Sequence, residues 1–115
     1  MPPSNQSTRL NNFEEFWPFY VREHAHPTNR ALHFIGSTFG LICLILVFMT
    51  GNIWFLPTGL ALGYGFAWVG HFFVERNKPA SFKYPFWSFY SDWKMWFLML
   101  SGRMELEVRR AEENT

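Results

Sequence analysis

Residues 34–74 read FIGSTFGLICLILVFMTGNIWFLPTGLALGYGFAWVGHFFV and contain no Asp, Glu, Lys or Arg. By contrast, residues 1–33 hold three Arg and three Glu, and residues 75–115 hold seven Lys or Arg and six Asp or Glu. As one helix the uncharged stretch would be about 60 Å long, twice the roughly 30 Å hydrocarbon core of a bilayer. The pattern therefore predicts two membrane crossings rather than one.

The reversal between the crossings is expected at Thr50-Gly51-Asn52, a polar turn-forming tripeptide. Two soluble core helices are the alternative, but such helices normally have one polar face, and neither arm has one. The outer ends of the hairpin carry the basic residues Arg22, Arg30, Arg76, Lys78 and Lys83, and the turn carries none. The positive-inside rule therefore places both termini in the cytoplasm.

The segments on either side of the hairpin predict helices at the membrane surface. Residues 11–26 place Phe13, Phe16, Trp17 and Tyr20 at helical spacing, which is typical of an amphipathic helix. Residues 86–101 are aromatic but too short and too charged for a simple span, which favours an interfacial or re-entrant helix. Residues 102–115 are expected to form a cytoplasmic tail. The predicted fold is all-α, one integral membrane domain whose hairpin comprises residues 28–50 and 53–76.

Composition excludes several classes of protein. The 115 residues carry a net charge of only +1, so the chain lacks the basic surface that nucleic-acid binding requires. Aromatic residues make up 21 %, which excludes a disordered chain. The single cysteine, Cys43, excludes an intrachain disulfide framework.

All four histidines are expected at the cytoplasmic face of the hairpin. His33 precedes Gly51 by 18 residues and His71 follows it by 20, so the two side chains should lie at matching depth. His24 and His26 precede the first arm, and the break at Pro27 allows either to fold back toward His33.

Residues near the histidines have spacings that suit a metal site. His71 and Glu75 are an i, i+4 pair, which can share a metal or let the carboxylate orient the imidazole. Imidazoles with a carboxylate suit non-haem Fe(II) better than Ca²⁺ or Mg²⁺, and Zn²⁺ is the alternative on ligand type. The structural alternative is that each histidine is a hydrogen-bonded interface residue without a ligand. Asp92 is equally suited to a helix cap and to a site group.

Small residues recur on both arms of the predicted hairpin. Gly36 and Gly40 form one small-xxx-small pair, and Gly59 and Gly63 form another. These pairs would let the arms approach closely enough for side chains from both to meet in one site. The same stripes are one candidate contact for a homodimer.

Two blocks of the sequence resemble a known family. Tyr20, His24, Asn29 and His33 follow the pattern Tyr-x3-His-x4-Asn-x3-His, and the second block matches at His71, Glu75, Lys78 and Pro79. They are similar to the signature blocks of a family of small membrane proteins that includes the yeast 2-hydroxy fatty acid dioxygenase of alpha-oxidation. The resemblance extends from about residue 13 to residue 96.

The resemblance implies an Fe(II)-dependent, O₂-consuming removal of one carbon from a long-chain 2-hydroxy fatty acid, which gives an odd-chain acid. At the cytoplasmic face, such a substrate could enter the site from the membrane lipid. The resemblance points to His24, His33 and His71 as iron ligands or essential site residues, with Glu75 at the site. The expected supporting residues are Asn29, Tyr20 and His26, of which His26 lies outside the matched pattern. Arg76 and Lys78 are candidates for binding the substrate carboxylate, or alternatively lipid phosphates.

A second interpretation comes from another functional class. The chain would then be a non-catalytic membrane binding or assembly protein, and its histidines would form a structural metal site or a pH sensor. The identity of the metal distinguishes the two: iron with open coordination positions favours catalysis, and a closed zinc site favours structure.

Overall fold

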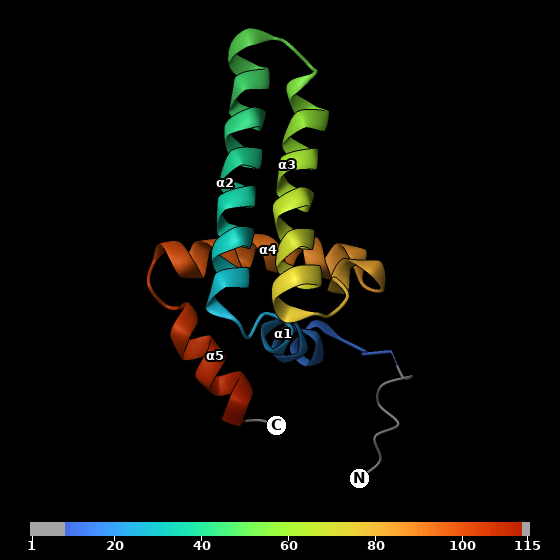
Figure 1. Ribbon diagram of the computed structural model, residues 1–115, viewed down its shortest axis with the longest axis vertical. Helices are drawn as coiled ribbons and strands as arrows, with labels where there is room; N and C mark the ends of the chain where they lie inside the picture. Colours follow the sequence, from blue (N-terminus) through green and yellow to red (C-terminus); the bar gives the residue numbers. More distant parts are fainter. Residues whose placement is uncertain (1–8, 114–115) are drawn as a thin grey trace.

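The computed structural model describes residues 9–113, which are helical and contain no strand (Figure 1). The all-α prediction is confirmed. In chain order, the helical elements are α1 (Phe13–Arg22), α2 (Pro27–Thr50), α3 (Phe55–Val69), the π-helical turn η2 (Gly70–Glu75), the 3₁₀ turn η3 (Ala80–Phe82), α4 (Pro85–Leu100) and α5 (Met104–Glu113). The last two residues of the predicted tail lie outside the described residues.

Helix α2 has clear start and stop signals. Its N-cap is His26, whose side chain accepts a hydrogen bond from the Thr28 N–H, and Pro27 occupies the first turn. It ends at Thr50 and is capped by Gly51, which has a φ of 73° and donates its N–H to the Val47 carbonyl. That left-handed conformation favours glycine, and it reverses the chain at the predicted turn.

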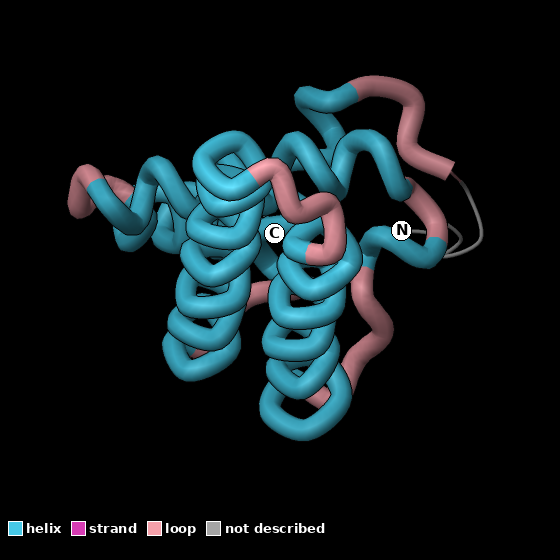
Figure 2. The backbone as a smooth tube through the Cα atoms, turned by 90° about the horizontal axis from the view of Figure 1, so that it is seen from above, coloured by secondary structure: helices cyan, strands magenta, loops and turns pink. Residues whose placement is uncertain are grey.

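Helices α2 and α3 pack side by side as an antiparallel hairpin (Figures 1 and 2). A Cβ added at Gly36 would lie 2.8 Å from the Phe66 Cβ, and one at Gly59 would lie 2.9 Å from the Cys43 Cβ. The predicted close approach of the arms is therefore confirmed. Because Gly36 and Gly59 face the partner helix of the same chain, these two are not free to form the dimer contact considered above.

The open end of the hairpin rests on the other three helices. Helix α4 crosses it, α1 packs against α4 and α5, and both ends of the described chain lie on this side (Figure 1). The core of this base is a cluster of large side chains that includes Phe16, Tyr20, Tyr84, Met95 and Met104. Helix α1 ends at Arg22, earlier than the predicted 11–26, because the following residues turn back toward α2.

The stem of the hairpin exposes its apolar side chains. Among the described residues, α2 is the one helix long and apolar enough to cross a membrane. Only 17 % of the residues in its apolar 18-residue stretch are buried. Helix α3 has fifteen residues and continues into the six-residue turn η2. At the tip of the hairpin, the large apolar side chains of Phe48, Met49, Ile53 and Trp54 are all exposed.

Candidate metal centre

Three imidazoles from different elements meet at the open end of the hairpin. His24 lies in the link between α1 and α2, His33 in α2, and His71 in the turn η2. One nitrogen from each lies within 4.8 Å of those of the other two, and all three residues are buried. The ring planes are close to mutually perpendicular, with centroids 4.4 to 4.9 Å apart. The predicted convergence of these three histidines is confirmed.

The link between α1 and α2 is held by a buried arginine. Arg30 donates to the carbonyls of His24 at 2.7 Å and Ala25 at 2.8 Å, and its other nitrogen pairs with Glu105 of α5 at 3.1 Å. His24 and Ala25 follow the end of α1, so the arginine satisfies two carbonyls that a longer α1 would have paired with its own N–H groups. They fix the chain reversal that turns the His24 ring toward α2.

The turn η2 brings an unpredicted residue to the site. Arg76 adopts a left-handed φ of 62°, and the Asn77 N–H donates to the His71 carbonyl at 2.9 Å. The Asn77 Oδ1 then lies 2.7 Å from the His71 Nδ1. The Asn77 amide donates in turn to the Glu23 carbonyl at 3.0 Å. The signal in the sequence was Asn77 itself, six residues after His71, but its contact requires a chain reversal that spacing alone does not show.

The hydrogen bonds fix the protonation of two imidazoles. A carbonyl only accepts, so the His24 Nδ1, 2.6 Å from the Tyr20 carbonyl, carries a proton. The Asn77 amide group faces Glu23, so its oxygen faces His71, and the His71 Nδ1 carries a proton as well. Burial, followed by the neighbouring His33 and His71, lowers the pKa of His24 well below its usual value. In the neutral rings, both Nε2 atoms therefore present lone pairs.

These lone pairs face each other across a short distance. The Nε2 atoms of His24 and His71 are 3.0 Å apart, with no proton between them in the neutral state. The His33 Nε2 has no hydrogen-bond partner within the described part of the chain. Nitrogens bound to one metal ion at about 2.0–2.1 Å lie roughly 3 Å from each other. A cation bound between the three nitrogens would replace the repulsion between the lone pairs with attraction to the ion. These three nitrogens therefore fit a metal ion.

Asp92 and Tyr20 lie beside the histidines. The Tyr20 hydroxyl donates to the Asp92 Oδ1 at 2.5 Å, and that oxygen is 3.8 Å from the His33 Nδ1. Burial raises the pKa of Asp92 to about 7, against the lowering effect of the tyrosine hydrogen bond. The Tyr20 ring also stacks on the His24 ring, with centroids 4.1 Å apart. Asp92 lies inside α4, so the cap interpretation is wrong and its place is beside the site.

Three predicted site residues, Glu75, His26 and Asn29, lie around the link between α1 and α2 and make no hydrogen bond to the three imidazoles within the described part of the chain. The Glu75 carboxylate accepts from the His26 backbone N–H at 2.6 Å and from the Asn29 amide at 3.2 Å. These bonds hold the start of α2 against η2. The His26 side chain is exposed, so of the two histidines before α2 it is His24 that folds back toward His33. The position of His26 as the N-cap of α2 directs its ring away from the cluster.

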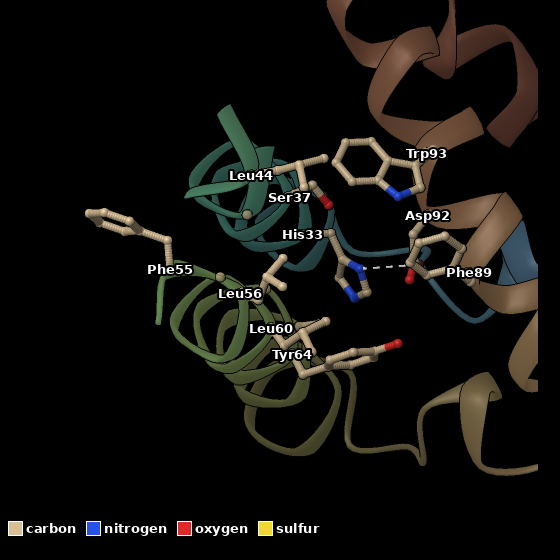
Figure 3. Close-up of a pocket in the computed structure, with 14 residues that line it drawn as sticks. His33, Ser37, Leu44, Phe55, Leu56, Leu60, Tyr64, Phe89, Asp92 and Trp93 are labelled. Atoms are coloured by element: carbon tan, nitrogen blue, oxygen red, sulfur yellow. Dashed lines mark ion pairs between the residues drawn. The ribbon is translucent and has the colours of Figure 1, made fainter. Parts of the chain in front are cut away.

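Two adjoining spaces lie at the site. A cavity of about 10 Å³, close to the size of one water, lies among the three histidines. It is also lined by Ser88, whose hydroxyl has no hydrogen-bond partner among the described residues. A groove of about 350 Å³ follows the hairpin beside it, and Figure 3 shows His33 among its lining residues, facing Asp92. The exposed Arg76 and Lys78 line neither space.

Comparisons with known proteins give one match. A family model described as "Mpo1-like: 2-hydroxy-palmitic acid dioxygenase Mpo1-like" matches residues 10–104. No curated protein and no solved structure matches the chain significantly. The matched range contains all three clustered histidines together with Asn77 and Asp92.

Proposed function

Because the chain belongs to the Mpo1-like family of 2-hydroxy-palmitic acid dioxygenases, we propose that it is an Fe(II)-dependent dioxygenase of long-chain 2-hydroxy fatty acids. The observation that carries the proposal is the meeting of three imidazole nitrogens, two of them with opposed lone pairs 3.0 Å apart. Neutral imidazoles around a small buried cavity suit a non-haem metal ion, and the family description supplies the reaction class.

The proposed reaction shortens the acid by one carbon. The bond between C1 and C2 breaks, C2 becomes the carboxyl carbon of the product, and C1 leaves as CO₂. One O₂ accepts the four electrons, and its oxygen atoms balance an overall yield of the shorter acid, CO₂ and water. A 2-hydroxy acid with an even number of carbons therefore gives an odd-chain acid.

Different residues of the chain would bind the metal, orient its ligands and bind the substrate. His24, His33 and His71 would hold the metal, and Fe(II) bound there would supply the redox chemistry for O₂ that side chains lack. The Tyr20 carbonyl accepts the Nδ1–H of His24, and Asn77 accepts the Nδ1–H of His71. These bonds fix the orientation of each ring and make its Nε2 a more basic metal ligand. Glu75 and Asn29 act as positioning residues, because they hold the link that carries His24. The unpaired Ser88 hydroxyl would bind the polar head of the acid.

We further propose that the hairpin is inserted in a membrane with both termini in the cytoplasm. The support is the exposure of its apolar side chains, the low burial of α2 and the restriction of charged residues to the base. Helices α1 and α4 would then lie at the interface, at the depth of the three histidines. The exposed Arg76 and Lys78 would contact lipid phosphates or the carboxylate of an arriving substrate.

The test is a reaction with defined products. The chain, purified in detergent and loaded anaerobically with Fe(II), is mixed with 2-hydroxypalmitate and O₂, and the acids are analysed by mass spectrometry. We expect pentadecanoate to form with O₂ uptake, and palmitate, which lacks the hydroxyl, to remain unchanged. Stoichiometric native zinc, together with no O₂ uptake by the iron-loaded chain, would contradict the proposal and favour the non-catalytic interpretation.

Replacing Asn77 with alanine should weaken metal binding without removing a ligand. The His71 Nδ1–H would lose its acceptor, and loss of such an outer partner costs about 10–100-fold in metal affinity. Asn77→Asp keeps an oxygen for His71 and should retain more affinity than Asn77→Ala. The measurement is competition with a metal chelator of known affinity. Equal affinities for native chain and Asn77→Ala would show that this hydrogen bond does not support the site.

A further inference from the structure

The groove beside the histidines has one polar end and a long apolar wall. Its polar end is formed by His33 and Asp92, and the remainder is lined mainly by aliphatic and aromatic side chains and by glycine (Figure 3). From His33 it follows α2 as far as Leu44, which is about 16 Å of helix. It is therefore shaped for a narrow apolar chain with a polar group at one end.

This groove adjoins the histidine cavity. Both spaces are lined by His33, Tyr64, Ala67 and Asp92. An apolar chain in the groove would therefore bring its polar end to the histidines. Helix α4 adds Phe89 and Trp93 to the wall, so the hairpin and α4 together form the sides of the groove.

We infer that this groove holds the acyl chain of the 2-hydroxy acid and that Gly40, halfway along it, sets the length of chain admitted. The inference rests on the proposed function for the identity of the polar head. A 2-hydroxy acid lying in this direction has C1 and C2 at the histidines and its methyl end toward the tip of the hairpin. Long chains are then selected by the length of the groove.

Gly40 is suited to this role because its missing side chain leaves the groove open. A Cβ there would meet its nearest atom, the Gly59 carbonyl oxygen, at 3.5 Å, an ordinary contact. A larger side chain can therefore be introduced without forcing the helices apart at the first atom. By contrast, a Cβ at Gly59 would collide with the Cys43 Cβ, so that glycine is required for packing.

The first test compares Gly40→Leu with Gly65→Leu. Gly65 lies on α3 outside the groove, and a Cβ there has no atom within 4 Å, so it controls for adding a leucine to the hairpin. For each chain, kcat/KM is measured for 2-hydroxypalmitate and for 2-hydroxyoctanoate in the same detergent. We expect Gly40→Leu to lower the ratio of long-chain to short-chain values by about tenfold or more, since one misfitting methylene in an apolar pocket costs at least that. Gly65→Leu should leave the ratio unchanged, and an unchanged ratio in Gly40→Leu would overturn the inference.

A binding test separates this inference from the proposed function. A long-chain 2-hydroxy acid brominated in mid-chain is added to the metal-free protein, and the Trp93 contribution to quenching is taken as the difference from Trp93→Phe. We expect saturable quenching that unlabelled 2-hydroxypalmitate reverses, and its loss in Gly40→Leu. Such quenching without O₂ uptake in the iron-loaded chain would refute the dioxygenase and retain the groove. O₂ uptake without saturable quenching of Trp93 would refute the groove and retain the dioxygenase.

Discussion

Replacement of His33 or His71 with alanine is expected to abolish metal binding and the proposed oxidation. Each residue supplies one of three converging nitrogens, so either substitution leaves only two of them. Loss of an outer partner alone costs about 10–100-fold in metal affinity, so loss of a ligand should exceed about 100-fold. The measurement is elemental analysis after anaerobic Fe(II) loading and removal of free metal. We expect about one iron per native chain and a small fraction of that in either variant.

The matched control for these variants is His26→Ala. His26 is exposed and caps α2, so its loss should lower the free energy of unfolding by about 1 kcal/mol and leave the bound iron unchanged. Circular dichroism verifies that all three variants remain helical. Full iron binding by His71→Ala, or loss of iron from His26→Ala alone, would place the metal elsewhere in the chain.

The hairpin and the meeting of the histidines could be predicted because both follow from distances along helices. The uncharged residues 34–74 fix the position of the arms, and Gly51 fixes the turn. Similar numbers of residues on either side of Gly51, 18 and 20, then place His33 and His71 at similar depth. Pro27 indicated a break in the chain, and that break returns His24 to the cluster.

The partners of the imidazoles could not be predicted, because they depend on tertiary packing and on one irregular turn. The i, i+4 rule assumes an α-helix from His71 to Glu75, whereas that segment is π-helical. Glu75 consequently bonds to the start of α2, and Asn77 takes the position beside His71. Asp92 reaches His33 from α4, a helix whose placement no local spacing determines.

A second large effect is expected where η2 packs against the start of α2. Gly70→Ala at this contact should lower the free energy of unfolding. A Cβ at Gly70 would lie 1.9 Å from the Asn29 Oδ1 and 3.4 Å from the Asn29 Cα. Asn29 is fully buried and donates to Glu75, so its side chain can move only by breaking that bond. Overpacking together with an unpaired buried polar group should cost about 2–5 kcal/mol of unfolding free energy. The measurement is chemical denaturation in detergent, followed by tryptophan fluorescence.

The cause of this loss can be tested with a double variant. Gly65→Ala controls for the change of residue type, since a Cβ at Gly65 has no neighbour and should stabilise the helix by up to about 1 kcal/mol. If the collision with Asn29 is responsible, Gly70→Ala should cost much less in a chain that already carries Asn29→Ala, because the opposing oxygen is gone. Strictly additive losses would show that Gly70 and Asn29 act independently. The loss in Gly70→Ala would then come from the glycine position itself and not from its contact with Asn29.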